Sequence, residues 1–146
     1  VKIKWPNDFI IQNKKISGMI LEKKKMNKVN YLILGIGINI LQNDFPGLPK
    51  AGSIFTQTGQ KFDLHIFAQQ LHEHFVEKIT CAISEDDILE QYNKRLFRKN
   101  KISVFEKNSI RQNGIILKAD AEGFLWIDLD TAGLQKFFHK EIEMLY

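Results

Sequence analysis

The most constraining feature of the sequence is an apolar segment of ten residues that carries two glycines, residues 31–40 (YLILGIGINI). It is too short to span a membrane, which takes about 20 apolar residues, and its glycines disfavour a helix. We therefore expect a sheet strand that is buried on both faces. Two glycines inside a strand also predict that something packs closely against its backbone.

Shorter apolar segments before it predict further strands. We expect these strands at 1–5, 9–11 and 16–21, with a turn at Pro6-Asn7-Asp8 after the first. The lysine-rich segment 23–30 predicts a solvated hairpin. Segment 41–59 contains prolines and glycines without periodicity, which predicts a long loop.

Two amphipathic helices are expected next. Asp63 caps the first, in which apolar residues recur every three or four positions as far as Ala82. Ser84 begins the second, and the three acids that follow it suit the positive end of the helix dipole. Beyond the basic segment 98–101 we expect short strands with turns between them, at 102–106, 109–112, 115–119, 124–130, 134–138 and 141–145.

These patterns predict an α+β chain with a boundary near Asn100. Residues 1–100 form a mixed α/β part, and residues 101–146 suit a small closed or half-closed β-barrel. The net charge of +4 favours anionic partners without choosing among them. The single cysteine, Cys81, excludes an internal disulfide framework and a multi-cysteine zinc site, and it fits a reducing compartment.

Three local clusters offer chemistry: Lys4-Trp5-Pro6-Asn7-Asp8, Lys15-Ile16-Ser17-Gly18 and Gly35-Ile36-Gly37-Ile38-Asn39. Taken singly, they are a turn, a solvated strand end and a weak glycine pattern. Together they supply a cation, oxygen ligands of the kind that Mg²⁺ takes, and a backbone bare enough for a flat ligand. Such a set suits activation of a carboxylate by a nucleoside triphosphate, because a lysine and a metal offset the charge that develops.

The order and spacing of K-W-P-N-D, K-I-S-G and G-I-G-I-N resemble the catalytic domain of biotin protein ligases. Ala51-Gly52-Ser53-Ile54 is similar to the family's A-T-S-L stretch, with Gly52 in place of the threonine. In the tail, residues 123–127 resemble the family's G-x-[I/L]-x-[I/L] pattern, and Lys140-Glu141-Ile142 stands where the family closes on G-E-[I/V]. The implied fold is a partial, class II synthetase-like catalytic domain (the biotin/lipoate ligase fold) followed by an SH3-like β-barrel.

The resemblance implies an ATP-dependent ligase that activates biotin as biotinyl-adenylate and transfers it to a lysine of a biotin-carboxyl-carrier domain. ATP, biotin and Mg²⁺ are the implied cofactors. The implied catalytic residues are Lys15, Asp8 and Asn39, of which Asp8 and Asn39 also hold the metal. Strand register leaves open whether Lys14 or Lys15 points inward, and the motif alignment favours Lys15. The implied cofactor-binding residues are Trp5, Asn7, Lys15, Gly18, Gly35, Gly37, Asn39 and Ser53, with segment 41–58 covering the adenylate.

The family's upstream G-R-G-R-type loop and its biotin-binding strands are not in this sequence. We therefore expect the chain to be a C-terminal half of a ligase, with weak or no activity unless the N-terminal half is supplied. A cytoplasmic location is expected, without a membrane contact, and a homodimer is left open.

The alternative is a non-catalytic interaction module or a basic nucleic-acid-binding module. Nucleic acid is not an expected partner, because Trp126 lies in sequence beside Asp128 and Asp130 and not among Lys or Arg. The run Lys23-Lys24-Lys25-Lys28 is more simply a solvated hairpin.

Overall fold

The chain divides into two compact units in the computed structural model, which describes residues 1–146. Unit 1 comprises Val1–Pro6 and Ile83–Tyr146, and unit 2 comprises Asn7–Ala82. Helices combine with two antiparallel sheets, so the expected α+β class is confirmed. The units reflect the density of contacts. The division into functional domains at 1–100 and 101–146 is a different one and stays a prediction.

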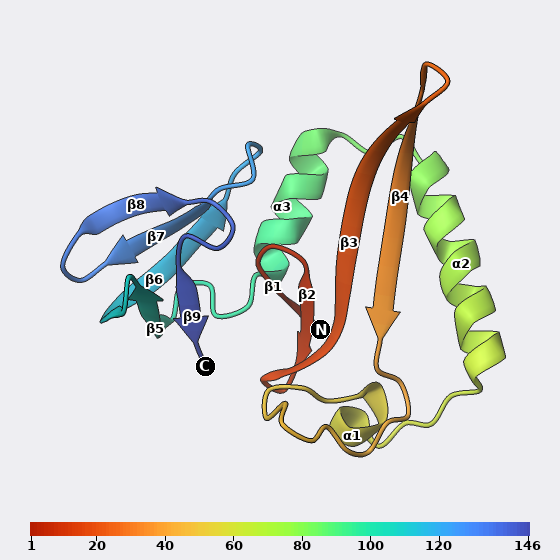
Figure 1. Cartoon of the computed structure of the whole chain (residues 1–146), viewed down its shortest axis with the longest axis horizontal. Helices are drawn as coiled ribbons and strands as arrows, with labels where there is room; N and C mark the ends of the chain where they lie inside the picture. The colour runs from red at the N-terminus through yellow and green to blue at the C-terminus, as the bar shows by residue number, and fades with distance from the viewer. The chain divides into compact units, whose positions relative to one another are not determined.

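Unit 2 is built on the antiparallel strands β2 (Asp8–Ile11), β3 (Lys14–Met26) and β4 (Val29–Ile38). Figure 1 shows β3 and β4 as one long hairpin. Asn27 and Lys28 connect them with φ of 49° and 65°, the backbone of a type I′ turn. The expected hairpin at 23–30 is present, and most of its lysines lie on the strands and not in a connector.

The expectation that residues 31–40 are buried on both faces is wrong for this structure. Leu32 is 68% exposed and Ile33 is 48% exposed. A Cβ added to Gly35 or Gly37 would meet no atom within 4 Å, so nothing packs closely on this backbone either. The physical reason is that β4 packs closely against β3 alone, so no helix or second sheet covers its two faces. Hydrophobicity indicated a preference for burial, but it could not specify a covering element.

Two helices follow β4: α1 (Ile54–Thr58), which the sequence did not predict, and α2 (Leu64–Thr80). The expected cap of α2 is confirmed, because Asp63 Oδ1 accepts from the backbone N–H groups of His65 and Ile66 at 2.9 and 3.0 Å. The half-buried side of α2 carries Phe67, Leu71 and Phe75, as the periodicity predicts, but no residue of α2 is fully buried. None of the helices is both long and apolar enough to cross a membrane.

Unit 1 begins with β1 (Lys2–Lys4) and resumes with α3 (Glu85–Arg95). Ser84 caps α3 as expected, its Oγ accepting from the Asp87 N–H at 3.1 Å. The Phe97 N–H donates to the Ile3 carbonyl at 2.7 Å and thereby fastens β1 to the end of α3. The remaining elements are β5 (Ile102–Lys107), β6 (Ile110–Ala119), β7 (Leu125–Leu129), β8 (Gly133–Phe137) and β9 (Glu143–Leu145).

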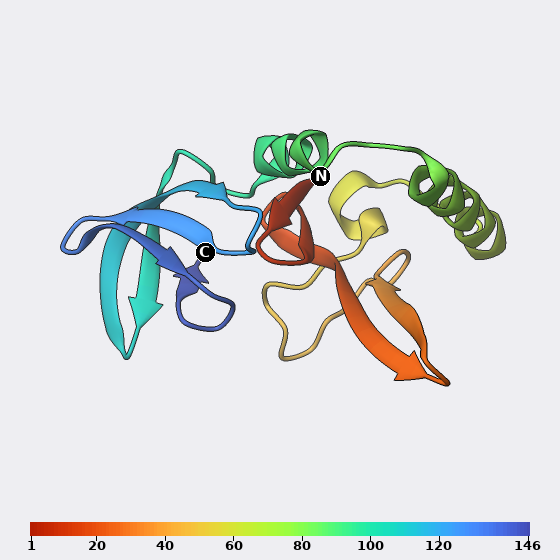
Figure 2. The ribbon, with the colours of Figure 1, turned by 90° about the horizontal axis from the view of Figure 1, so that it is seen from above.

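These five strands form an antiparallel sheet in the order β8-β7-β6-β5-β9. Figure 2 shows that this sheet is strongly curved. The hydrogen-bonded order has two ends and does not close, so the SH3-like barrel expected for residues 101–146 is not confirmed. Phe105, Ile127 and Phe137 are almost wholly buried and form the centre of the core of this sheet.

The turn expected between the strands at 109–112 and 115–119 is wrong, because β6 continues through Asn113 and Gly114. Gly114 lies between Ser103 on β5 and Leu129 on β7. A Cβ there would stand 2.8 Å from Leu129 Cδ2, so the glycine marks a close approach inside the sheet and not a turn.

Candidate functional site

A register shift between β2 and β3 determines which lysine joins the carboxylate of Asp8. Phe9 lies opposite Ser17, and Ile10 lies opposite Lys15, so Ile16 is an extra residue with no partner of its own. Residues three apart on a strand ordinarily face opposite sides, and a bulge of one residue returns them to the same side. Lys15 and Gly18 therefore share a face.

The geometry agrees with this bulge. Lys15 Nζ lies 2.7 Å from Asp8 Oδ1, and a Cβ added to Gly18 would lie 3.3 Å from that same oxygen. The ammonium of Lys14, by contrast, donates to the Pro49 carbonyl. The ambiguity that the sequence left between the two lysines is thus resolved in geometry: Lys15 faces the carboxylate and Lys14 does not.

The same face continues across the sheet as bare backbone. Gly18 is directly opposite Asp8 on one side and Gly37 on the other. Gly35, two residues before Gly37, faces the same way. Gly18 and Gly37 therefore form a small floor without side chains beside the Asp8–Lys15 ion pair, and Gly35 extends it along β4. Ile20, which is opposite Gly35, borders this floor on the same face.

Segment 50–53 ties the end of this floor together. The Lys15 N–H donates to the Lys50 carbonyl at 2.8 Å, and the Gly52 N–H donates to the Lys15 carbonyl at 3.0 Å. Asn39 Nδ2 donates to the Gly52 carbonyl at 3.0 Å, so Gly52 connects the strand of Lys15 to Asn39. Ser53 is completely buried and caps α1, its Oγ accepting from the Thr56 N–H and donating to the Gln42 carbonyl.

Asn7 and Trp5 lie outside the ion pair. Asn7 Nδ2 donates to the Met19 carbonyl, and the Met19 N–H donates back to the Asn7 carbonyl at 3.2 Å, so Asn7 braces the start of β2 against β3. Trp5 belongs to unit 1, where its indole Nε1 donates to the Gly123 carbonyl at 3.2 Å. The structure thus brings Asp8, Lys15 and Gly18 into direct contact, and it gives Asn7, Asn39 and Ser53 bonds to the neighbouring backbone.

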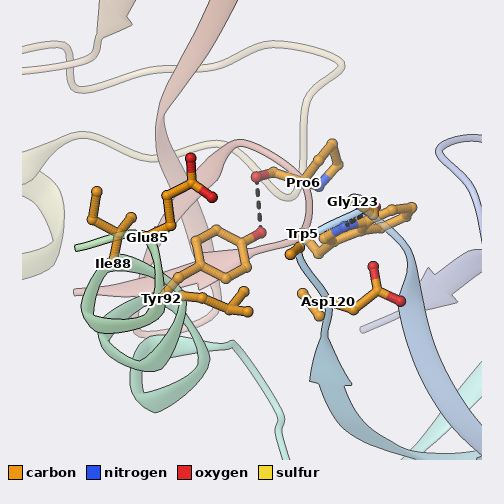
Figure 3. Close-up of a pocket in the computed structure, with 10 residues that line it drawn as sticks. Trp5, Pro6, Glu85, Ile88, Tyr92, Asp120 and Gly123 are labelled. Carbon is orange, nitrogen blue, oxygen red and sulfur yellow. Dashed lines mark hydrogen bonds between the residues drawn. The ribbon is translucent and has the colours of Figure 1, made fainter.

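Unit 1 has a separate pocket of about 480 Å³, lined mainly by apolar and aromatic side chains (Figure 3). Trp5 and Pro6 line it from the end of β1, and Ile88 and Tyr92 line it from α3. The Tyr92 hydroxyl donates to the Pro6 carbonyl at 2.9 Å, and burial raises the pKa of this phenol well above its usual range. No sequence pattern had indicated this pocket, because its walls come from three distant parts of the chain.

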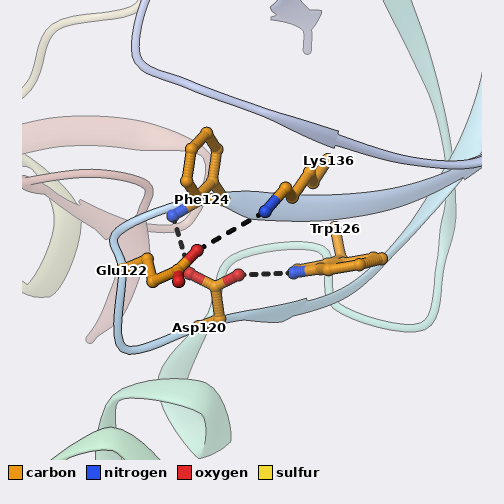
Figure 4. Close-up of polar contacts among 5 residues, drawn as sticks. All are labelled: Asp120, Glu122, Phe124, Trp126 and Lys136. Atoms are coloured by element: carbon orange, nitrogen blue, oxygen red, sulfur yellow. Dashed lines mark hydrogen bonds and ion pairs between the residues drawn. The ribbon is translucent and has the colours of Figure 1, made fainter.

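Asp120, at the same pocket, lies in a polar network (Figure 4). Its carboxylate accepts from Trp126 Nε1 at 2.7 Å and from the Phe124 N–H at 2.9 Å. Desolvation alone would raise the pKa of the Asp120 carboxyl. The hydrogen bonds from Trp126, Phe124 and the Glu122 backbone, with the charge of Lys136, outweigh it, so the net pKa lies below its usual value.

The surroundings of Trp126 also correct an expectation. The Nζ atoms of Lys118 and Lys136 lie 5.5 and 5.9 Å from the centre of a Trp126 ring. The argument that this tryptophan has no basic neighbours is therefore wrong, because strand pairing brings Lys118 and Lys136 beside it from β6 and β8.

Residues 1–39 match the model of the biotin/lipoate A/B protein ligase family. Over 66 residues the chain is 44% identical to the bifunctional ligase/repressor BirA of Bacillus subtilis (strain 168). The matched segment covers 42% of this chain and 20% of that protein. The BirA of Bacillus spizizenii is 42% identical over the same length. The chain is thus similar to biotin protein ligases in its first half.

The solved biotin protein ligases share its fold. The apo enzyme of Aquifex aeolicus superposes with a TM-score of 0.73 at 23% identity, covering 99% of this chain and 64% of that one. Its complex with biotin and ATP gives the same TM-score at 22% identity, covering 99% of this chain and 61% of that one. The Leishmania major enzyme with biotinyl-5-AMP gives 0.56 at 20%, covering 94% and 56%. The chain thus spans less than two thirds of these relatives.

The motifs that carry the resemblance to biotin protein ligases lie in the segment that matches the family model, except for the A-G-S-I stretch and the tail. Gly52 has a larger structural role than its sequence pattern alone indicated. A Cβ at this position would stand 2.8 Å from Lys14 Cβ. Glycine in place of the threonine of the family pattern was the signal in the sequence for this close approach.

Proposed function

We propose that the chain forms part of an ATP-dependent ligase that activates biotin as biotinyl-adenylate and transfers it to a lysine of a biotin-carboxyl-carrier domain. The observation that carries the proposal is the Asp8–Lys15 ion pair beside the glycine floor, within the segment that matches the ligase family. A flat bicyclic acid needs a bare surface for its body and a cation for its carboxylate, and this face offers both.

In the proposed first step, a carboxylate oxygen of biotin attacks the α-phosphorus of ATP, a new P–O bond forms, and pyrophosphate leaves. Lys15 serves as the positive charge between carboxylate and α-phosphate, which would otherwise repel each other. Asp8 holds the ammonium in place at 2.7 Å before the substrates arrive. In the second step the acceptor lysine amine attacks the acyl carbon, an amide forms and AMP leaves.

Mg²⁺ fits the proposed site by the chemistry of its donors. The Asp8 carboxylate and the Asn39 amide oxygen are hard ligands of the kind that Mg²⁺ takes, while the chain holds no cluster of three or more His, Cys, Asp or Glu side chains for a metal. Mg²⁺ commonly completes its shell with substrate phosphates and water. When bound, the ion neutralises charge on the phosphates.

The other residues of the proposed site position the substrates. We assign Gly18, Gly35 and Gly37 to the body of the ligand, and Asn7 to the nucleotide. Trp5, which the sequence placed in the same set, belongs to unit 1 and is not included in this assignment. Asn39 and Ser53 hold segment 41–58, which covers the adenylate and keeps water from it. Residues 101–146 are proposed to be the SH3-like C-terminal domain of such a ligase.

The decisive experiment compares Lys15→Gln with Lys14→Gln in the protein at its full natural length. Biotin-dependent exchange of pyrophosphate into ATP measures the first step alone. We expect Lys15→Gln to lower it about a hundredfold. Lys14→Gln should stay within about threefold, because it loses only an exposed contact to the Pro49 carbonyl. Equal rates in the two variants, with both folded by circular dichroism, would refute the assignment.

One observation favours the second candidate, a nucleic-acid-binding module: Trp126 has lysines on two neighbouring strands. Bases stack on such aromatic surfaces, and lysines follow the phosphates. Against it, Lys136 pairs with Glu122 at 3.4 Å, and the Trp126 indole is engaged by Asp120. Salt-sensitive binding of an oligonucleotide that Lys118→Gln weakens would support this candidate.

A further inference from the structure

The pocket of unit 1 falls in the size range of ligand sites. Its volume of about 480 Å³ lies between the roughly 300 and 1,000 Å³ typical of binding pockets. Trp5, Ile88 and Tyr92 are among its apolar and aromatic lining residues. Ile88 is 54% exposed, so its apolar side chain is available for contact. Aromatic side chains of this kind dominate the energy of many protein interfaces.

The hydrogen-bond donors of the aromatic walls are already used. Trp5 Nε1 donates to the Gly123 carbonyl, and the Tyr92 hydroxyl donates to the Pro6 carbonyl (Figure 3). These side chains therefore present carbon surface and π-faces to the pocket. A phosphate or a carboxylate would find no side-chain donor of theirs to bind.

The charged groups of the pocket are all acidic. Glu85 and Asp120 line it, and no lysine or arginine does. Asp120 is engaged by Trp126 and lies near Lys136, whereas Glu85 makes no ion pair and no side-chain hydrogen bond. Glu85 thus leaves an unpaired carboxylate at the edge of an apolar pocket, which favours a cation beside an apolar group.

We propose that this pocket binds a segment of a partner protein in which an apolar side chain stands next to arginine or lysine. The apolar side chain packs between Trp5, Ile88 and Tyr92, and the cation pairs with Glu85. The argument uses only unit 1 and does not depend on the ligase reaction, so failure of one proposal leaves the other intact.

The test uses fluorescence anisotropy with a labelled peptide that carries leucine and phenylalanine between arginines, titrated with the 146-residue chain. We expect saturable binding that weakens as salt is added. A peptide with glutamates in place of the arginines, and one with serines in place of the apolar residues, should each bind at least about fivefold more weakly. Absence of saturable binding, or equal binding of the glutamate peptide, overturns the proposal.

Paired variants locate the site. Glu85→Gln should weaken binding about fivefold, whereas Asp86→Asn, which removes the same charge from the same first turn of α3 but does not line the pocket, should not. Ile88→Ser should weaken binding further, with Ile110→Ser as the control at a similarly exposed isoleucine on β6. Binding that these pairs do not distinguish lies elsewhere on the chain, and that result also overturns the proposal. Circular dichroism checks that each variant is folded.

Discussion

The Tyr92 hydroxyl and the Pro6 carbonyl form a bond between residues 86 positions apart in the sequence. It joins α3 to the end of β1, two parts of unit 1 that local sequence does not connect. Burial raises the pKa of this phenol, so the neutral form is favoured in the folded state. The folded state therefore requires the protonated phenol, which also makes the hydrogen bond.

Tyr92→Phe should lower the free energy of unfolding by about 1 kcal/mol at neutral pH, because a half-buried carbonyl loses its donor. Since the folded pKa is raised, the protonation term is fully present below the unfolded pKa of about 10 and is lost as pH rises above it. The variant should thus show a shallower loss of stability above pH 10 in urea unfolding. Tyr31→Phe, at a 46% exposed tyrosine, is the control, and equal slopes for wild type and Tyr92→Phe would contradict the account.

The contribution of Asp120 to stability should depend on pH in the opposite direction. Its folded pKa is lowered, so its contribution is fully present above the unfolded pKa of about 3.9 and is lost as pH falls through the folded value. Asp120→Asn should lower Tm at pH 7, and the gap to wild type should narrow below about pH 4. Asp128→Asn removes an exposed carboxylate on β7 as a control. A gap that is constant with pH would show that the charge of Asp120 does not matter.

At the scale of elements, helix caps could be predicted from the sequence, and the neighbours of a strand across the sheet could not. Asp63 and Ser84 cap helices as expected, because a cap depends on the next three residues. Asn113-Gly114 has the composition of a turn, but the close approach of Leu129 places the glycine within β6.

The candidate site shows the same limit. The three motifs were visible in the sequence, and the glycine floor follows from their register. The choice between Lys14 and Lys15 depended on a bulge opposite Phe9 and Ile10, which no residue pattern in β3 reveals.

Alanine substitutions at two glycines test whether a close contact or the strand itself determines where glycine is needed. A Cβ at Gly52 would lie 2.8 Å from Lys14 Cβ and 3.0 Å from Gln57 Nε2, so Gly52→Ala should cost about 1–3 kcal/mol of stability. Gly35→Ala meets open space in an extended strand and should be neutral or stabilising by about 0.5 kcal/mol. Urea midpoints with equal m-values report both changes. A similar loss in both variants would mean that the strand itself, and not the contact at Gly52, sets the cost.

At the scale of the whole molecule, the buried apolar side chains are unevenly divided. Ten of the twelve lie in unit 1, and only Ile10 and Ile16 lie in unit 2. Burial of apolar surface is the main favourable term in folding. Helix α2 has no fully buried residue, and the apolar side chains of β4 are largely exposed. The two units therefore should not be equally stable.

Hydrogen exchange followed by mass spectrometry tests this on the 146-residue chain. Amides open with free energies that range from near zero up to that of global unfolding, according to how much packing each segment would lose. We expect peptides from α2 (Leu64–Thr80) to exchange fastest among the long elements and peptides from β6 and β7 to exchange slowest. If the chain instead unfolded as one cooperative block, the slowest amides of α2 and of β7 would report the same free energy. That outcome would show that contacts beyond the buried core support unit 2.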